Sequence, residues 1–308
     1  MKENIYDLII IGGGPAGITA GIYASRQKLK TLVITKDFGG QMAKKAVDIE
    51  NYPGFEKISG LDLIKKFENH LKKQKVDIER DEAGKVEKNN KGFIVLTENK
   101  NKFQSKAVII ASGSDPRPLE VPGEKEFIGR GLSYCSICDG PLFRNKMVAV
   151  IGGGDAGFES AIFLSNYVSK IYILEYGSEV KADKANQEMV KKTGKVKIIT
   201  NAALREIKGN KFVNSIVYQD LKSKKINTLK VEAVFVEIGY QPATSFVKDL
   251  VDFNERDEIK TESETCQTKT PGLFAAGDVN MGKYKQIVTA CGEGAKAALA
   301  AYEHVKKN

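Results

Sequence analysis

Two cysteines spaced three positions apart, with an aspartate directly after the second, are the residues of this chain best suited to chemistry. They are Cys135, Cys138 and Asp139, in the stretch SYCSICDG at residues 133–140. A pair with this spacing can form a redox disulfide, supply half of a metal site, or be two unreactive thiols. Each interpretation requires different partners elsewhere in the sequence.

A structural zinc site needs about four ligands, usually from a second closely spaced pair. The histidines are His70 and His304. The other cysteines, Cys266 and Cys291, are single and 25 positions apart. No second pair is therefore available, and we expect no metal site. Two buried, unreactive thiols are also disfavoured, because Ser, Gly and Asp surround the pair.

A redox disulfide is the favoured interpretation. A CxxC pair closes a small ring when its first residue lies at a helix start, and helix amides there stabilise the thiolate that attacks a disulfide. A dithiol cycle must also move a proton, and histidine, the usual carrier, is absent from this stretch. Asp139 is the available acid. It can also serve as a capping or turn residue of the loop, or do both.

An internal repeat supplies the elements that would position this pair. YDLIIIGGGPAGITAGIYAS at 6–25 recurs as MVAVIGGGDAGFESAIFLS at 147–165, at a constant offset of 140 residues. The next apolar stretch keeps the register, with KTLVIT at 30–35 matching KIYILE at 170–175. Each copy is a β-branched apolar run, a GxGxxG motif and a helix-like stretch, and so predicts a strand, a tight turn and a helix.

The glycines of this motif have distinct physical roles in a dinucleotide site. The first permits the tight turn, the second lets the backbone approach a pyrophosphate, and the third lets helix and strand pack closely. The helix N-terminus supplies amide donors and the positive end of a dipole. One such motif can be a βα turn without a ligand, but two in register favour two dinucleotide sites. Near the C-terminus, Gly277 and Asp278 follow an apolar strand, where the aspartate can accept a bond from a sugar hydroxyl or simply form a turn.

The bulk composition is that of an ordinary globular protein of two domains. The chain has 308 residues, of which 42% are hydrophobic and 28% charged, and its net charge of +9 comes mostly from lysines spread along the chain. We interpret them as solvated faces and expect neither nucleic acid nor membrane as a partner. Four cysteines do not make a secreted disulfide framework. Acidic residues and glycines interrupt the N-terminal apolar stretch, so we expect no signal peptide and a cytoplasmic location.

Several stretches together resemble one family along the whole chain. They include IIIGGGPAG at 9–17, GGQMAKKAVDIENYPGF at 39–55, SYCSICDGPLF at 133–143, VAVIGGGDAG at 148–157, EIGYQP at 237–242, GLFAAGD at 272–278 and YKQIVTACGEGAKAAL at 284–299. The chain is similar to the low-molecular-weight thioredoxin reductases. More narrowly, it resembles the C-terminal reductase portion of the alkyl hydroperoxide reductase flavoprotein.

The resemblance implies an α/β fold with two Rossmann-like, three-layer dinucleotide-binding domains, one inserted into the other. Residues 1–115 and 246–308 would form the FAD domain, and residues 116–245 the inserted nicotinamide domain that carries the CxxC. The residues implied to bind FAD are Gly12, Gly14, Pro15, Ala16, Gly17, Gly39, Gly40, Gln41, Asn51, Ala111, Ser112, Gly113, Gly277, Asp278, Lys285, Gln286 and Ile287. Those implied to bind NAD(P)H are Gly152, Gly154, Asp155, Ala156, Gly157, Glu175 and Gly239.

The same resemblance implies different chemical roles for the two cysteines and for Asp139. Cys138 would be the flavin-proximal thiol that forms a charge-transfer thiolate, Cys135 would attack the disulfide of a partner, and Asp139 would supply the proton. Electrons would pass from the nicotinamide through FAD to the cysteine pair. The pair cannot face both the flavin and a partner protein while the nicotinamide also reaches FAD, and the family solves this by a rotation of one domain relative to the other. The first glycine motif begins close to residue 1, so we expect the acceptor to be a separate thioredoxin-like or glutaredoxin-like protein. The family is usually a homodimer.

The residue at the end of the second strand indicates which nicotinamide is used. Glu175 lies 21 positions after Gly154, where an acidic side chain accepts bonds from ribose hydroxyls and repels a 2′-phosphate. NADPH-using relatives carry HRRxxxR here, whereas this chain has EYGSEVKAD. We therefore predict NADH, with NADPH as the alternative, because Lys181 and Lys184 are near enough in sequence to reach a phosphate.

Two other functions are compatible with parts of the sequence. One is a reductase of the same fold fed by ferredoxin or another non-nicotinamide donor, against which the intact second glycine motif argues. The other is a flavin-free protein that binds nucleic acid through its basic surface, which predicts a colourless protein and binding that falls steeply with salt.

Overall fold

The protein is described by a computed structural model that covers residues 5–42 and 48–307. The chain divides into two compact units, residues 1–115 with 240–308, and residues 116–239. The sequence predicts the second boundary at about 245–246, with Gly239 and Pro242 as the local markers of the crossing. The structure places it between Gly239 and Tyr240, because the amide of Ala243 donates to the carbonyl of Gly113 at 3.1 Å and holds the following segment on the first unit.

The unit formed by residues 1–115 and 240–308 is built on a seven-stranded sheet. Its strands in spatial order are β5 (Val76–Glu79), β2 (Thr31–Phe38), β1 (Ile5–Gly13), β8 (Lys102–Ile110), β7 (Gly92–Thr97) and β6 (Ala83–Asn89), with β19 (Leu273–Ala275) also paired to β8. β5, β2, β1, β8 and β19 are parallel neighbours, whereas β6, β7 and β8 form an antiparallel meander. The short strands β3 (Asp48–Ile49) and β4 (Ile58–Ser59) pair separately.

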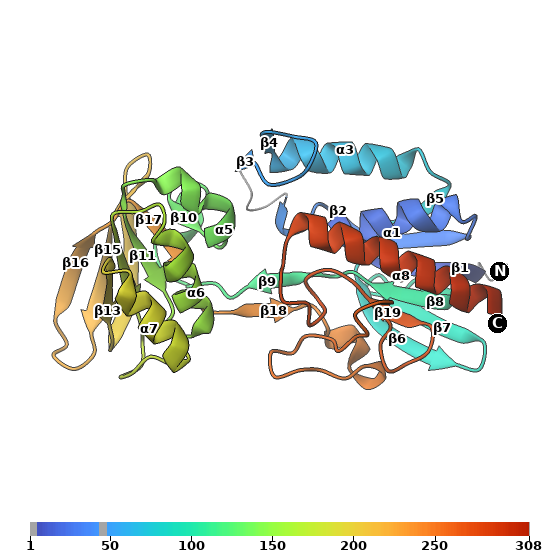
Figure 1. Ribbon diagram of the computed structural model, residues 1–308. Coiled ribbons are helices and arrows are strands. Elements are labelled where there is room, and N and C mark those ends of the chain that lie inside the picture. Colours follow the sequence, from blue (N-terminus) through green and yellow to red (C-terminus); the bar gives the residue numbers. More distant parts are fainter. Residues whose placement is uncertain (1–4, 43–47, 308) are drawn as a thin grey trace. The chain divides into compact units, whose positions relative to one another are not determined.

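Residues 8–11 of β1 form a continuous apolar run because both faces of the sheet are covered there. Successive side chains point to opposite faces, so Leu8 and Ile10 pack under the helices while Ile9 and Ile11 pack on the opposite side. The helices on the first face are α1 (Pro15–Arg26), α3 (Gly60–Lys72) and α8 (Ile287–Lys307), and the 3₁₀ helix η2 (Ser245–Leu250) contributes to the second (Figure 1). The unit therefore has three layers.

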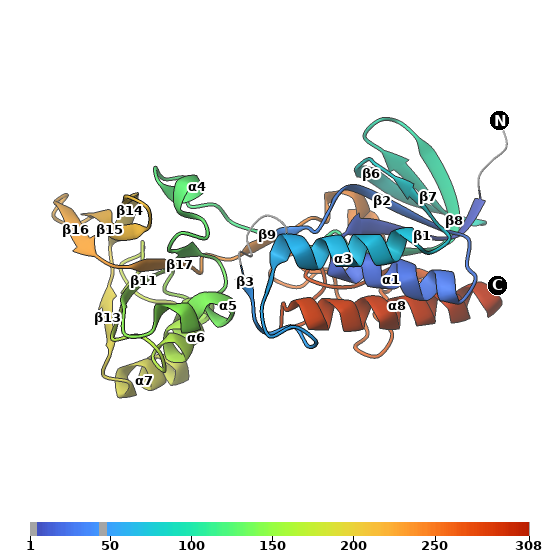
Figure 2. The same ribbon diagram turned by 90° about the horizontal axis from the view of Figure 1, so that it is seen from above.

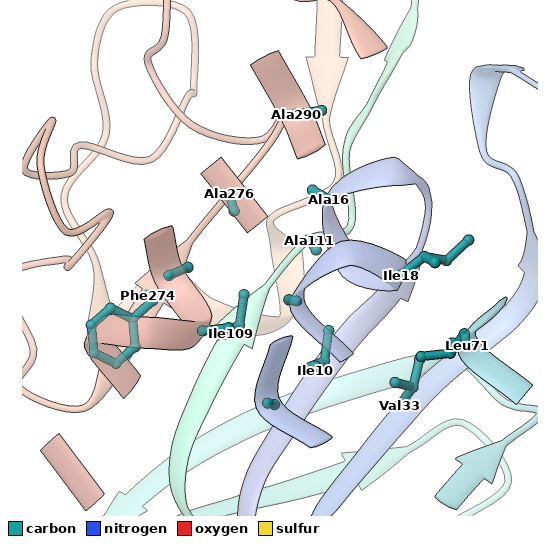
Figure 3. Packing of buried hydrophobic residues seen from close by; sticks show 14 of the residues in the cluster. Ile10, Ala16, Ile18, Val33, Leu71, Ile109, Ala111, Phe274, Ala276 and Ala290 are labelled. Carbon is teal, nitrogen blue, oxygen red and sulfur yellow. The ribbon is translucent and has the colours of Figure 1, made fainter. Parts of the chain in front are cut away.

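α1 and α8 lie side by side, although they belong to the two ends of the chain (Figure 2). The backbones approach so closely at one point that a Cβ on Gly294 would be 2.2 Å from the carbonyl oxygen of Ala16. Figure 3 shows Ala16, Ala276 and Ala290 together at this junction, with Ile10 and Ile109 beneath them. Small side chains thus bring the N-terminus of α8 to the first glycine motif.

Residues 116–239 form a second three-layer unit around a parallel sheet. The strands of this sheet in order are β10 (Leu132–Ser133), β17 (Ala233–Val236), β11 (Met147–Ile151), β12 (Lys170–Leu174) and β13 (Val196–Ile199). One face is covered by α6 (Asp155–Leu164) and α7 (Lys184–Lys192), and the other by the antiparallel meander β14 (Ala202–Gly209), β15 (Val213–Asp220) and β16 (Ile226–Lys230). The remaining helices are α4 (Glu124–Phe127), α5 (Ser136–Asp139) and the 3₁₀ helix η1 (Gly140–Phe143).

The chain passes twice between the units. β9 (Ser114–Pro116) and β18 (Tyr240–Pro242) pair with each other as a two-stranded sheet where these passages occur. The prediction of an α/β fold with two Rossmann-like units, one inserted into the other, is confirmed. Within the described ranges, the structure contains no helix of the length and apolarity needed to cross a membrane. The same ranges contain no group of three or more His, Cys, Asp or Glu side chains that could hold a metal ion.

Candidate active site

Cys135 and Cys138 form a disulfide at the start of α5. Cys135 is the residue before the helix, and its Sγ accepts the backbone N–H of Cys138 at 3.2 Å. Cys138 is exposed and Cys135 is half-buried. The predicted placement of the first cysteine at a helix start is confirmed, and its sulfur lies where a helix amide can stabilise a thiolate.

The carboxylate of Asp139 is held beside this disulfide by a hydroxyl that the sequence alone did not single out. Ser133, at the end of β10, donates from Oγ to Oδ2 of Asp139 at 2.6 Å, and the same Oγ accepts the backbone N–H of Cys135 at 3.0 Å. The amide of Asp139 donates to the carbonyl of Cys135 at 3.1 Å. Asp139 is thus part of the turn and also presents an oriented carboxylate. Ser133 belongs to the same eight-residue stretch, and its position two residues before the first cysteine was the available signal.

The two glycine turns have the same backbone geometry. Gly12 has φ of +119° and Gly152 has φ of +123°, values that favour glycine. A Cβ on Gly17 would be 1.9 Å from the carbonyl oxygen of Gly12, and a Cβ on Gly157 would be 2.0 Å from that of Gly152. These are the tight turn and the close helix–strand packing that the repeat predicted. Gly14 and Gly154 have open space beside them, as close approach of a phosphate requires.

The first turn is surrounded by the segments expected to bind FAD. A Cβ on Gly12 would be 2.1 Å from the carbonyl oxygen of Ala111. The amide of Gly39 donates to the carbonyl of Gly13 at 2.9 Å, which places the 39–40 turn on the glycine motif. Gly277, with φ of +79°, lies against Ala16, since a Cβ there would be 3.0 Å from the Ala16 Cβ. Four segments distant in sequence therefore meet at one end of β1.

Polar contacts join further members of this set. The Nε2 of Gln41 donates to Oδ2 of Asp278 at 3.1 Å, and the Nδ2 of Asn51 donates to Oε1 of Gln286 at 3.2 Å. Ser112 is directed elsewhere, because its Oγ donates to the carbonyl of Ala243 at 2.7 Å. Gly40 and Gly113 have positive φ; a Cβ on Gly113 would meet nothing within 4 Å, and a Cβ on Gly40 would lie 4.0 Å from the Cα of Gly14. Pro15 is the first residue of α1 and Ile287 the first of α8.

Asp278 and Lys285, both expected to bind FAD, differ in whether their charged groups are already paired within the protein. Burial raises the pKa of Asp278 to about 6, and the nearby ammonium of Lys285 partly opposes this shift. The Nζ of Lys285 pairs with Glu258 at 3.1 Å and also donates to the carbonyl of Asn280. The side chain of Lys285 is thus tied to its own loop, whereas Asp278 presents a carboxyl that a hydroxyl donor would help to keep ionised.

At the second turn, both carboxylate oxygens of Glu175 accept backbone amides. Oε2 accepts from Gly153 at 2.7 Å and Oε1 from Gly177 at 2.7 Å, so the side chain is held against the glycine turn. In the first turn the equivalent position is Thr35, whose Oγ1 donates to the carbonyl of Asp37 at 2.7 Å. Thr35 lies against Gly13 as Glu175 lies against Gly153, so residues 140 positions apart occupy equivalent places in the two turns.

The other predicted nicotinamide residues lie around the same turn. Asp155 begins α6, and its Oδ1 accepts the amide of Asp183 at 2.8 Å and the Nδ2 of Asn186 at 2.9 Å. Ala156 is exposed in the first turn of α6. Gly239 has φ of +97°, and its carbonyl accepts the amide of Arg117 at 2.9 Å, so it lies at the crossing between the units.

Comparison with known proteins identifies the family. A pyridine nucleotide-disulphide oxidoreductase family model matches residues 6–294. The chain is 40% identical over its full length to the F subunit of alkyl hydroperoxide reductase of Staphylococcus aureus strain MRSA252, and it spans 60% of that protein's length. The corresponding protein of Staphylococcus epidermidis is 38% identical over 99% of this chain, which likewise spans 60% of that protein.

Solved structures extend the similarity to complete chains. Thioredoxin reductase from Streptococcus pyogenes MGAS5005 is 36% identical, with a TM-score of 0.94 and full coverage of both chains. Thioredoxin reductase from T. acidophilum is 38% identical with a TM-score of 0.65, and the match covers 98% of this chain and 99% of that one. The predicted resemblance is confirmed, and family membership implies FAD and a pyridine nucleotide. The chain belongs to the pyridine nucleotide-disulphide oxidoreductase family and is similar to thioredoxin reductase along its whole length and to part of the F subunit of alkyl hydroperoxide reductase.

Proposed function

We propose that this protein takes electrons from NADH, and less readily from NADPH, and delivers them to the disulfide of a separate thioredoxin-like or glutaredoxin-like protein. The observation that carries the proposal is the Cys135–Cys138 disulfide at the start of α5, in the same unit as the second glycine turn. FAD is assigned to the unit formed by residues 1–115 and 240–308, and the nicotinamide to residues 116–239.

The residues around the first turn fit FAD. The open glycines leave backbone amides free to approach a pyrophosphate, and the partly buried carboxyl of Asp278 suits a ribityl or ribose hydroxyl. When bound, FAD and the nicotinamide supply the hydride and electron transfer. Gly12, Gly14 and Gly17 would hold the pyrophosphate end, with Gln41 and Asp278 beside it.

NADH is supported by the charge at the second turn. Glu175 is fixed by the amides of Gly153 and Gly177 at the end of β12, so a carboxylate faces the place of the ribose hydroxyls. Lys181 and Lys184 are exposed, and the backbone amide of Lys181 donates to the carbonyl of Gly153 at 2.8 Å, so Lys181 flanks the same turn and NADPH is kept as the weaker donor. A carboxylate at this position accepts bonds from ribose hydroxyls and repels a 2′-phosphate.

The chemistry of the pair balances as a dithiol–disulfide exchange. The reduced pair holds two electrons and two protons. The thiolate of Cys135 attacks one sulfur of the partner's disulfide, and the other partner sulfur leaves and takes a proton, for which Asp139 is the positioned acid. The thiolate of Cys138 then attacks Cys135, which restores the Cys135–Cys138 disulfide and releases the second partner thiol.

The similarity to thioredoxin reductase supports a separate protein as the acceptor, and the described residues contain no second cysteine pair that could act as an internal one. All four cysteines lie within the described ranges, and the remaining two are free thiols, Cys266 buried and Cys291 half-buried. Burial raises the pKa of Cys266 to about 11 and raises that of Cys291 as well, so both are poor nucleophiles. A homodimer is the assembly that the family resemblance favours, and sedimentation velocity tests it.

An anaerobic titration tests the proposal directly. Purified holoprotein is titrated with NADH and separately with NADPH while the flavin absorbance is followed, and oxidised candidate acceptors are then added. We expect NADH to bleach the flavin and a thioredoxin-like or glutaredoxin-like disulfide to restore its colour. Bleaching by reduced ferredoxin but by neither nicotinamide would overturn the assignment of the donor, and a flavin that no protein disulfide reoxidises would overturn the assignment of the acceptor.

A further inference from the structure

A chain of two hydroxyls and one carboxyl joins the redox helix to the end of β17. The Oγ of Ser160, in α6, donates to Oε1 of Glu237 and lies 2.7 Å from the Oγ of Ser136. Ser136 and Ser160 are 5% and 7% exposed, and Glu237 is partly buried. All three belong to the unit of residues 116–239. The sequence alone indicated no role for these side chains, although Glu237 is a single charged residue directly after the apolar run of β17.

Ser136 connects this chain of contacts to the disulfide. It follows Cys135 directly and is the first residue of α5, the short helix that carries Cys138 and Asp139. Its side chain is buried, whereas the next residue, Ile137, is 50% exposed. The side chain of Ser136 therefore links the CxxC turn to Ser160 of α6, and Ser160 in turn donates a hydrogen bond to the carboxyl of Glu237.

The charge of Glu237 changes in the neutral pH range. Burial raises its pKa to about 7, the negative charge of Glu159 raises it further, and the hydroxyls of Ser160 and Ser136 lower it. The groups that face this carboxyl are thus Ser136 of α5 and Ser160 and Glu159 of α6. At the opposite end of β17, Glu232 is ion-paired with Lys146 at 2.6 Å and its pKa is lowered by that contact.

We propose that Glu237 is a positioning residue for the redox pair, which acts through Ser160 and Ser136 to hold the first turn of α5 and sets by its charge how readily a thiolate forms there. The inference rests on the proposed function, since it concerns the same disulfide. Reduction of the disulfide by two electrons with uptake of one proton leaves a thiol and a thiolate. The negative charge of an ionised Glu237 disfavours the negative charge of this thiolate. Because the coupling between two sites is mutual, formation of the thiolate also favours protonation of Glu237.

Thiol reactivity tests this directly, without turnover. Holoprotein is reduced anaerobically with an excess of a phosphine, and the rates of iodoacetamide alkylation of Cys135 and Cys138 are followed from pH 5 to 9 by peptide mass spectrometry. In this reaction the thiolate displaces iodide and forms a thioether, so the rate reports the thiolate fraction. We expect the wild-type rate to show an inflection near neutral pH in addition to that of the thiol itself.

Two variants separate positioning from general stability. Glu237→Gln keeps the shape but removes the charge, so the neutral inflection should disappear and alkylation at pH 8 should become up to about tenfold faster, equivalent to about one unit of thiol pKa. Ser160→Ala keeps the carboxyl but removes the hydroxyl that favours its ionised form. The inflection should then persist and move to higher pH. Glu232→Gln, at the other end of the same strand, is the matched control and should follow the wild-type profile.

The proposal is overturned if the Glu237→Gln and Ser160→Ala profiles superimpose on that of the wild type, or if Glu232→Gln produces the same change as Glu237→Gln. Either result can occur while NADH still drives reduction of a protein disulfide, so the proposed function would stand. Conversely, a failure of NADH to reduce the flavin leaves the alkylation profiles measurable, because the phosphine reduces the pair.

Discussion

The carboxylate of Glu175 accepts the backbone N–H of Gly153 at 2.7 Å, which fixes an acidic side chain on the second glycine turn. The matching contact in the first turn involves the neutral Thr35, whose Oγ1 would be 2.6 Å from a Cβ on Gly13. The two turns share one backbone geometry but present different charge to a nucleotide. This difference motivates the assignment of the nicotinamide to the second unit.

Replacement of Glu175 should change the preference between the two nicotinamides. In Glu175→Ser the loss of charge-assisted bonds to the ribose should lower kcat/KM for NADH by about 10- to 100-fold. The loss for NADPH should be smaller, because the carboxylate no longer repels the 2′-phosphate. Steady-state kinetics with both donors measures the ratio. Glu179→Ser, an exposed site in the same loop, is the control. An unchanged NADPH/NADH ratio in Glu175→Ser would contradict the assignment.

Removal of one redox cysteine should separate two activities. Cys138→Ser cannot form the disulfide, so reduction of a protein disulfide should fall to background. Reduction of the flavin by NADH should persist, because it does not use the sulfur. Both are measured on one preparation, the first with an oxidised thioredoxin-like acceptor and the second by stopped-flow bleaching of the flavin. Retained disulfide reduction would show that another group carries the electrons.

Removal of the acid beside the disulfide should slow the exchange. Asp139→Asn keeps an oxygen that can accept the Ser133 hydroxyl but cannot supply a proton, so turnover with a protein disulfide should fall by about 100-fold. Ser133→Ala leaves the carboxylate in place and loosens only its orientation, so it should cost less. Steady-state rates of the two variants provide the comparison. Equal losses would indicate that Asp139 acts only as a turn residue.

The paired glycine motifs allow a matched test of the two binding units. Gly17→Ala would place a Cβ 1.9 Å from the carbonyl oxygen of Gly12, so the purified variant should contain little flavin by its absorbance ratio. Gly157→Ala makes the same clash with Gly152 at 2.0 Å. That variant should retain flavin but lose reduction by NADH. Gly292→Ala, in α8 with open space around it, should be tolerated. The assignment of cofactors to units is wrong if Gly157→Ala is the variant that loses flavin.

The raised pKa of Glu237 predicts a pH-dependent stability. A carboxyl whose pKa rises from 4.5 to about 7 on folding binds more protons in the folded state between those values. Stability therefore falls as pH rises through this window, by up to about 3 kcal/mol. Glu237→Gln has no such loss, so its Tm relative to the wild type should be higher at pH 8 than at pH 5. Scanning calorimetry at both values measures the change. The same Tm difference at both values would show that Glu237 keeps an ordinary pKa.

The sequence alone determined the local elements of this protein. Gly12 and Gly152 permit the positive φ of the tight turn, and Gly17 and Gly157 permit close helix–strand packing, so both copies of the motif predict a strand, a turn and a helix. The apolar run of β1 and the three-position spacing of the cysteines are likewise local signals. The local structure that these signals predict depends on backbone sterics and on the periodicity of apolar residues, and both can be evaluated from a short stretch of sequence.

The contacts between distant segments were decided only by the tertiary structure. Gly277 lies against Ala16, and Glu237 reaches Ser136 through Ser160, because sheet order and helix packing bring those segments together. Gly239 and Pro242 mark the region of the second crossing in the sequence, whereas the pairing of β18 with β9 is a tertiary contact. No local pattern encodes such contacts. These contacts form when the burial of apolar faces brings distant segments together. The polar side chains on those segments are then buried as well, and they form hydrogen bonds with whichever polar groups lie next to them.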